Sequence, residues 1–326
     1  MNRPRPFFIN IMPRNDRRDD RGFLSSVERC AADSVRLGFQ YTLITFGHKR
    51  FDPWVLAQHA MRRNPKFAPL IAVNPAYEHP AAAAKRVASL THLFPNRLAL
   101  NLITGSFINE LSSLGDTLAP DARNKRLEEF CRVLQELLSP AGRSDHRGRF
   151  YRTKGLEIFP KLARPKLDIF VSGSFQGLMG RSTLAPLFVR NLRPPELLKP
   201  APGPDCGLGL GICARATAAQ AQAAVRRLFP PDRSGRLLFS LALQNTDTPW
   251  NRWLRPYLSR NDDARPDFDL TPMRNFASNV PFIVGSYEQV AEKLKGFVRT
   301  GYRFFLTDFH SGDGEHVKRI LARFRA

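Results

Sequence analysis

The stretch "PNRLALNLITGS", Pro95–Ser106, indicates the fold of this 326-residue chain. Residues 97–103 form a run of β-strand type, and small polar residues stand at its end. These polar residues are Asn101, Thr104, Gly105 and Ser106. The preceding stretch "PAAAAKRVASLTHLF" (80–94) is typical of a helix with proline in its first turn. A helix followed by a strand that ends in polar residues is a repeating unit of parallel β/α proteins.

The same unit recurs on both sides of this stretch. Strand patterns cover residues 6–12, 41–46, 68–74, 97–103, 167–173, 185–191, 207–214 and 302–309. Helical patterns cover residues 23–37, a stretch from about 53, and residues 80–94, 124–138, 217–229, 286–301 and 314–326. Eight strands that mostly alternate with helices predict a parallel α/β arrangement.

A closed (β/α)₈ TIM barrel and an open doubly wound sheet both fit this order. A dinucleotide-binding sheet would carry GxGxxG after its first strand, and this chain has none there. We therefore predict the barrel, as a single domain over residues 1–326, with its active site at the carboxyl ends of the strands. Residues 231–279, rich in Pro, Asn, Asp and Arg, predict an irregular excursion between the seventh and eighth strands that covers the site.

Bulk composition indicates a soluble globular protein. The hydrophobic content is 43%, and no apolar run reaches the roughly 18 residues that span a bilayer. The first residues lack the apolar segment of a signal peptide, so we expect a cytoplasmic location. Cys30, Cys131, Cys206 and Cys213 form no CxxC pair, and we expect buried free thiols. Because Cys206 and Cys213 are seven apart in one strand, they should face opposite sides.

The net charge of +21 permits several interpretations. A nucleic-acid binder would use such charge on phosphates, but here the positive residues are spread along the chain. No zinc finger, basic arm or RNP-like pattern accompanies them, which argues against nucleic acid. A solvated arginine-rich surface is the simpler interpretation, and an acidic macromolecular partner is the alternative.

The predicted strand ends supply the candidate site residues. They are His48, Lys49, Arg50 and Asp52 after the second strand, Asn101, Thr104, Gly105 and Ser106 after the fourth, Ser172, Gly173 and Ser174 after the fifth, Arg190 and Asn191 on the sixth, and Asp308, Phe309 and His310 after the eighth. Hydroxyls, small residues and cations suit an anionic ligand held partly by backbone N–H groups. The set contains neither a Ser-His-Asp arrangement nor metal-ligand spacing.

Two of these signals have ordinary structural alternatives. "SGS" (172–174) could hold a phosphate at a helix N-terminus, or it could only cap the helix. Asp308 and His310 could form an acid–base pair if the strand continues, and a surface histidine is the alternative.

The chain resembles the bacterial luciferase-like flavin monooxygenases, in particular the alkanesulfonate monooxygenase branch. The strongest stretch is residues 79–106, where Ala88, Ser89, Leu90, Leu93, Arg97, Asn101, Thr104 and Gly105 match the family's helix-and-strand pattern. Similar signals occur in "FDPWVLA" (51–57), "RPKLDIFVSGS" (164–174) and "PFIVGSYEQVAEKLKGFVRTGYRFFLTDF" (281–309). The resemblance covers nearly the whole chain.

This resemblance implies a TIM barrel that binds reduced FMN, supplied by a separate NAD(P)H-dependent flavin reductase, and that assembles as a homodimer. Thr104 and Gly105 match positions beside the flavin ring, and Asp52 matches an acidic position near it. Ser174 and the N–H groups around Gly173 match the phosphate site. Asn101 and Ser172 are further residues that we expect to bind the cofactor. We place His48, Arg50, Arg190 and His310 around the substrate.

Other positions depart from the family pattern. Gly211 stands near the family's catalytic histidine, Phe309 replaces a tyrosine, and Phe175 replaces the second serine of the phosphate motif. The main hypothesis is an FMNH₂-dependent, two-component monooxygenase whose substrate is small or carrier-tethered and anionic, with an acidic carrier protein as a partner. The alternatives are a flavin- or deazaflavin-dependent hydride-transfer enzyme, and a degenerate barrel that only binds flavin or an acidic partner.

Overall fold

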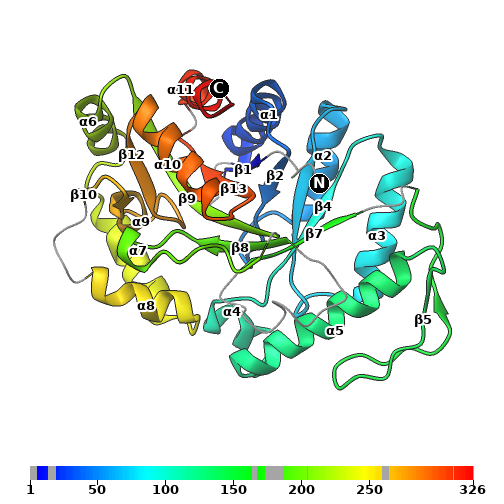
Figure 1. Ribbon diagram of the computed structural model, residues 1–326. Coiled ribbons are helices and arrows are strands. Elements are labelled where there is room, and N and C mark those ends of the chain that lie inside the picture. The colour runs from blue at the N-terminus through cyan, green and yellow to red at the C-terminus, as the bar shows by residue number, and fades with distance from the viewer. Residues whose placement is uncertain are drawn as a thin grey trace. The chain divides into compact units, whose positions relative to one another are not determined.

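The computed structural model describes residues 6–13, 20–163, 167–172, 187–203, 205–258, 264–310 and 312–325. Contacts within the chain divide it into two compact units, and Figure 1 labels their helices and strands. The first unit contains Met1–Ile11, Arg36–Gln40 and Phe188–Ala326, and the second contains Met12–Val35 and Tyr41–Leu187. That all 326 residues form one domain stays a prediction.

The second unit contains four parallel strands in sequence order. They are β2 (Tyr41–Ile44), β3 (Pro69–Val73), β4 (Ala99–Leu102) and β7 (Asp168–Ser172). Every residue of β2, β3 and β4 is buried, as expected for a parallel sheet that is covered on both faces. The carboxyl ends of these strands therefore meet at one edge, where polar loop residues can gather.

Proline begins the three long helices that connect these strands. They are α2 (Pro53–Arg63), α3 (Pro80–Leu93) and α5 (Pro120–Leu138). Proline suits a first turn because its missing N–H has no partner there and its φ already fits the helix. The shorter elements of this unit are α4 (Ile108–Ser113) and the hairpin strands β5 (Arg143–Ser144) and β6 (Leu156–Glu157). Helix α1 (Asp20–Leu37) is shared between the units.

The first unit is built around the long strand β9 (Cys206–Arg215). Strand β9 pairs in parallel with β8 (Leu187–Asn191), β12 (Phe282–Ser286) and β13 (Phe304–Asp308), and β13 pairs with β1 (Phe7–Ile11). The antiparallel strands β11 (Phe268–Asp269) and β10 (Ala264–Arg265) extend this sheet beyond β12. The eight predicted strands are thus found as β1, β2, β3, β4, β7, β8, β9 and β13.

Strand β9 alternates between two apolar clusters. Cys206, Leu208, Leu210 and Ile212 pack with α10 (Tyr287–Arg299) and α11 (Gly314–Arg325), whereas Cys213 packs with α6 (Ala218–Leu228). The prediction of opposite faces for Cys206 and Cys213 is confirmed. Both are free thiols, and burial raises the pKa of each to about 11. Cys131 is also buried and free, while Cys30 is half-buried.

The excursion between the seventh and eighth strands is more regular than predicted. It contains α7 (Arg233–Gln244), α8 (Pro249–Leu258) and α9 (Thr271–Arg274), and β12 follows it. The polar residues bound these helices rather than prevent them: Asp232 caps α7, and Pro249 begins α8. A 3₁₀ turn, Pro195–Leu197, lies earlier in the same unit. Across the described part of the chain, no helix is both long and apolar enough to cross a membrane.

Candidate active site

In the second unit, Asn101 on β4 and Ser172 at the end of β7 lie together. The Ser172 hydroxyl donates a hydrogen bond of 2.8 Å to Oδ1 of Asn101, and Asn101 is buried. Because β4 and β7 are adjacent parallel strands, their carboxyl ends bring these two side chains to the same edge. The bond uses the amide oxygen of Asn101, so its N–H groups are the part of the amide that can donate to a ligand.

Thr104 and Gly105 form the turn that leaves β4. Gly105 has φ = +77°, in the left-handed region, and a Cβ there would lie 3.0 Å from Nδ2 of Asn74 and 3.0 Å from Leu111. Glycine is therefore required both by the backbone conformation and by the close packing. The Thr104 hydroxyl makes one long contact of 3.4 Å to the Gly105 carbonyl oxygen, which is a weak hydrogen bond.

His48, in the loop after β2, is paired with a tyrosine from the loop after β3. Its Nδ1 lies 2.8 Å from the Tyr77 hydroxyl, and its backbone N–H points to the carboxylate of Glu110, 3.4 Å away on α4. Burial first, and then the Glu110 charge, raises the pKa of Tyr77, so its phenol is protonated at neutral pH. Either group can be the donor of this hydrogen bond, depending on the tautomer of His48.

Arg50 and Asp52, which were also predicted after β2, have structural partners. Arg50 donates a hydrogen bond of 3.0 Å to the Thr45 hydroxyl. Asp52 caps α2, and its Oδ1 accepts the backbone N–H groups of Trp54 and Val55 at 2.9 and 3.1 Å. Helix capping explains Asp52 without a ligand, and its assignment to the flavin stays a prediction.

Glu78 is a buried carboxylate near these strand ends. Its oxygens accept hydrogen bonds from the Trp54 indole at 3.1 Å and from Arg86 at 2.6 Å, and Arg86 also lies over the Trp54 ring. Burial raises the pKa of Glu78 despite these two donors, and the Asp52 charge raises it further. Shifted carboxylates of this kind are characteristic of functional sites, although ion-pair networks also produce them.

Asn74, Tyr77 and Glu78 were not among the site residues predicted from the sequence. All three follow β3, the strand whose end was left out of the candidate set. Asn74 is buried, and its Oδ1 accepts the backbone N–H of Ala76 at 3.0 Å. The signal that could have found these residues is the same one that found Asn101, namely polar side chains directly after a buried strand.

In the first unit, Asp308 and His310 each contact other neighbours. The Ser278 hydroxyl donates to Asp308 at 2.6 Å. Nδ1 of His310 accepts the Gly312 N–H at 3.3 Å, and its ring stands edge-on to Phe229 with centroids 6.1 Å apart. The arrangement does not support the acid–base pair, and a substrate role for His310 stays a prediction.

Arg190 on β8 lies near Tyr302 and Cys206. Burial raises the pKa of both groups, and the positive charge of Arg190 opposes that rise. Tyr302 precedes β13 and Cys206 begins β9, so these neighbours belong to the strand beginnings. Active sites of parallel β/α barrels lie at the other ends of the strands. The substrate role of Arg190 stays a prediction.

An aromatic ring occupies the space beside Gly211. A Cβ at Gly211 would lie 1.9 Å from the Phe282 ring, which comes from β12. Gly207 is crowded by the Phe304 ring in the same way, at 2.4 Å, whereas Gly209 meets nothing closer than 3.4 Å. The Phe282 ring thus fills the space beside Gly211, the position that matches the family's histidine. Gly173, Ser174 and Phe175, the predicted phosphate motif, lie outside the described residues.

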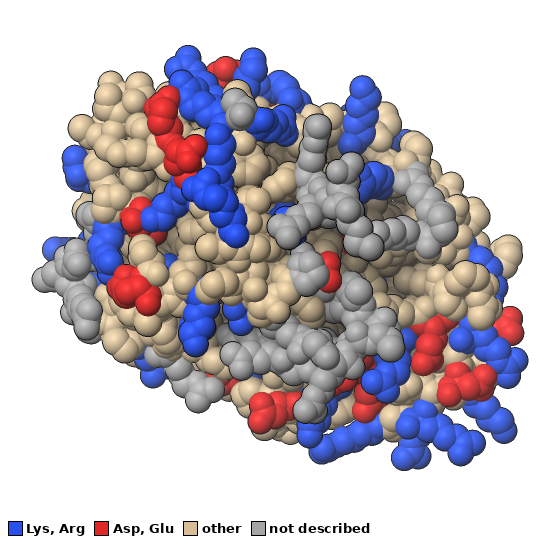
Figure 2. Space-filling model, viewed as in Figure 1, with Lys and Arg blue, Asp and Glu red and all other residues tan. Residues whose placement is uncertain are grey.

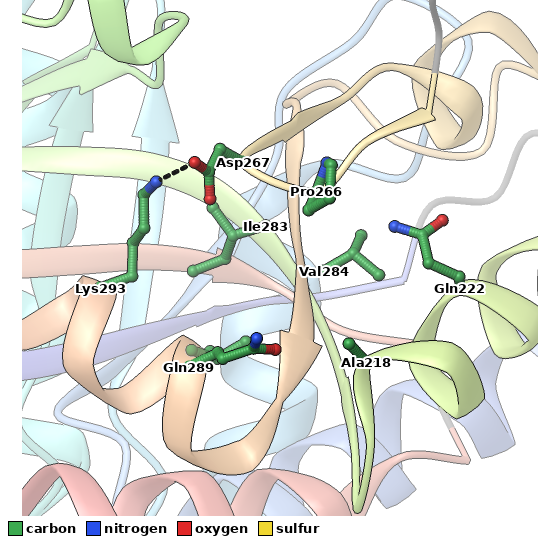
Figure 3. A pocket seen from close by; sticks show the side chains of 9 residues that line it. Ala218, Gln222, Pro266, Asp267, Ile283, Val284, Gln289 and Lys293 are labelled. Atoms are coloured by element: carbon green, nitrogen blue, oxygen red, sulfur yellow. Dashed lines mark ion pairs between the residues drawn. The ribbon is translucent and has the colours of Figure 1, made fainter.

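Two cavities lie away from the predicted site residues. Figure 3 shows the one in the first unit, where Lys293 pairs with Asp267 and the buried amide nitrogen of Gln222 has no hydrogen-bond partner in the described structure. Its volume is about 200 Å³, below the roughly 300 Å³ typical of small-molecule sites. The second, of about 270 Å³, lies at the strand beginnings of the second unit beside Tyr41, Arg97 and Asp168.

Within the described ranges, no group of three or more His, Cys, Asp or Glu side chains could hold a metal ion. Lys and Arg are scattered over all parts of the visible face, with fewer Asp and Glu (Figure 2). This distribution agrees with the charge spread along the sequence.

The chain is similar to a known protein family, to a named monooxygenase and to several solved structures. The family model for luciferase-like monooxygenases matches residues 6–177. BtrO of Niallia circulans, a monooxygenase of 4-(gamma-L-glutamylamino)butanoyl-BtrI acyl-carrier protein, is 29% identical over 91% of each chain. Riboflavin lyase RcaE, solved with modified FMN and riboflavin, gives a TM-score of 0.73 at 15% identity over 99% of this chain and 92% of that one.

An F420-dependent secondary alcohol dehydrogenase gives a TM-score of 0.65 at 13% identity, over 99% of this chain and all of that one. At these identities the structural likeness shows the fold alone. That fold is the closed eight-stranded luciferase-like TIM barrel, as predicted.

Proposed function

The chain belongs to the luciferase-like monooxygenase family, a family of oxidoreductases, and on that basis we propose that it is an FMNH₂-dependent monooxygenase of an acyl group tethered to a carrier protein. The observation that carries the flavin assignment is the cluster at the ends of β4 and β7, where Ser172 fixes Asn101 beside the Thr104–Gly105 turn. The carrier assignment rests on the likeness to BtrO.

The residues of this cluster fit a flavin. Gly105 keeps the turn free of a side chain, which lets a planar ring approach the backbone. The Asn101 amide and the Thr104 hydroxyl provide neutral hydrogen-bonding groups for the polar edge of the ring. When bound, reduced FMN supplies two electrons, so that O₂ places one oxygen atom on the substrate and the other in water.

His48 and Tyr77 are the groups that we assign to proton movement at the substrate. The phenol of Tyr77 holds the imidazole through Nδ1, and we propose that Nε2 is the ring atom that exchanges a proton with the substrate. Arg50, held by Thr45, provides a positive charge for an anionic group of the substrate. A flavin reductase that supplies FMNH₂ and a homodimeric assembly are further parts of the proposal.

Anaerobic titration with reduced FMN, followed by mixing with O₂, tests the cofactor. We expect binding in the micromolar range, and flavin reoxidation that yields one labelled oxygen atom on the acyl group when BtrI-bound substrate and ¹⁸O₂ are supplied. Tyr77→Phe should slow product formation without changing the affinity for reduced FMN.

Reduced F420 is titrated in parallel, because a structural relative is F420-dependent. Tight binding of F420 with no binding of FMN would replace the monooxygenase by a hydride-transfer enzyme. Binding of neither cofactor by the folded protein would support the degenerate barrel.

A further inference from the structure

Helix α7 exposes three leucines within five residues. Leu237, Leu238 and Leu241 are 62%, 50% and 51% exposed, and the other strongly exposed apolar side chains of the described structure lie singly or farther apart. Phe239, on the same helix, instead packs against the core of the first unit. One side of α7 therefore anchors the helix, while the other presents an apolar ridge to solvent, the kind of surface that marks a protein interaction site.

Arginines flank this ridge. Six arginines and two aspartates lie between Arg226 and Leu258, and no lysine or glutamate is present there. Arg226, Arg227, Arg233, Arg236 and Arg255 have exposed side chains. One of the two aspartates, Asp232, accepts the backbone N–H of Ser234 at the start of α7. The apolar ridge thus lies in a positive field, which complements an acidic surface.

The base of α7 is connected to a strand end of the same unit. Gly235 is pressed against the Asn275 carbonyl, 2.4 Å from where a Cβ would stand. The Asn275 amide donates to the Phe229 carbonyl oxygen at 2.9 Å, and the Phe229 ring contacts His310, which follows β13. Figure 1 shows α7 together with α8 and α9 on the flank of this unit. Asn275 and Phe229 thus connect α7 to His310, the residue that follows β13 by two positions.

We infer that the leucine ridge of α7, formed by Leu237, Leu238 and Leu241, docks the acidic carrier protein that brings the tethered substrate. The inference rests on the proposed function for the identity of the partner. Leucines at spacings of one and four residues on a helix suit the apolar groove or helix of a partner, and the arginine border suits its carboxylates. A second copy of this chain carries the same positive charge and is a poorer match to the ridge.

Binding of labelled BtrI acyl-carrier protein tests the inference. Leu237→Asp/Leu241→Asp should weaken binding about tenfold or more, because it removes the apolar anchor and adds like charges toward an acidic partner. Arg233→Glu should weaken binding about threefold, with a smaller effect at high salt. The matched control is Leu93→Asp, which changes a leucine that is 70% exposed on α3 of the other unit and should leave binding unchanged.

Catalysis gives a second readout. The double variant should raise KM for the carrier-bound acyl group but leave turnover of the same acyl group on N-acetylcysteamine unchanged. Equal carrier binding by the double variant and the unaltered protein, or no carrier binding by either, would overturn the docking surface. A dimer that the double variant converts to monomers, with carrier binding retained, would assign the ridge to a second copy. Reduced-FMN affinity is measured separately, so failure of the flavin proposal is distinguished from failure of the docking surface.

Discussion

The strand ends of the two units use their polar and glycine residues differently. In the first unit, Arg215 at the end of β9 is locked to Asp313 by two hydrogen bonds of 2.9 and 3.0 Å, and the space beside Gly211 is filled by Phe282. In the second unit, the strand ends carry the neutral pair Asn101–Ser172. A charged pair that stabilises the fold can bind a ligand only if the pair is broken. A neutral amide and a hydroxyl can bind a ligand while the fold stays intact. We therefore propose that the ligand binds at the strand ends of the second unit.

The largest loss in the free energy of unfolding should come from breaking the pair of Arg215 and Asp313. Arg215 and Asp313 are 7% and 5% exposed, so Asp313→Ala leaves a buried guanidinium uncompensated. We expect a loss of about 3–5 kcal/mol in the free energy of unfolding, measured by urea denaturation. The control is Glu315→Ala, which removes an exposed partner of Arg36 at 3.4 Å and should change stability by about 0–1 kcal/mol. Similar small losses for both variants would contradict a structural role for the pair.

Glycines of β9 provide the next test. Gly211→Ala forces a methyl group into the Phe282 ring and should cost about 1–3 kcal/mol, or more where the ring cannot move. Gly209→Ala, two residues away on the same face, meets only ordinary contacts and should be nearly neutral or stabilising. Thermal unfolding of the two variants checks the difference. If Gly211→Ala proves neutral, the Phe282 ring is not the reason that this position lacks a side chain.

Substitutions of two buried asparagines, one before β4 and one on it, should distinguish an effect on stability from an effect on FMN binding. Asn96, before β4, donates to the carbonyl oxygens of Asn64 and Phe67 at 3.0 and 2.7 Å, so Asn96→Ala should cost about 1–3 kcal/mol of stability. Asn101→Ala removes the acceptor of the Ser172 hydroxyl and should cost about 1 kcal/mol. Its affinity for reduced FMN should fall about tenfold, whereas the Asn96 variant that remains folded should bind as before. Equal affinities would remove Asn101 from the cofactor site.

Patterns along the chain were sufficient to predict the barrel and its eight strands, because each buried strand is a short apolar run bounded by turn residues. Strand β12 was not predicted, because the residues directly before the predicted helix 286–301 were given no element. The three helices of the excursion were missed because Pro and Asp mark helix starts as well as loops. Local composition alone does not distinguish these two uses.

The candidate site was predictable where it depends on strand order. Asn101 and Ser172 meet because adjacent parallel strands end at one edge, and the sequence placed both residues at those ends. The His48–Tyr77 pair joins two loops whose conformations depend on tertiary packing, so only one member was found. The filling of the Gly211 site by Phe282 could not be foreseen, because it depends on a strand that was itself missed.

The smallest expected change in stability concerns Glu78, a strand-end carboxylate of the second unit whose charged form burial penalises. Burial raises the pKa of Glu78 above its ordinary value. Between these two pKa values the folded state binds more protons than the unfolded state, so this group makes stability fall as pH rises through that window. Glu78→Gln removes the titration, and the free energy of unfolding measured from pH 4 to 7 should fall less steeply than in the unaltered protein.

The sign of this slope separates two roles for Glu78. A carboxylate held only as an ion-pair partner of Arg86 would have a lowered pKa, and its removal would change the slope in the opposite direction. A raised pKa means that the site keeps the carboxylate at a cost in stability, beside Trp54 and the loops that carry His48 and Tyr77. Such a shift is found at functional sites and also in structural ion-pair networks. The pH slope of Glu78→Gln therefore tests whether burial, rather than the ion pair with Arg86, decides the protonation of Glu78.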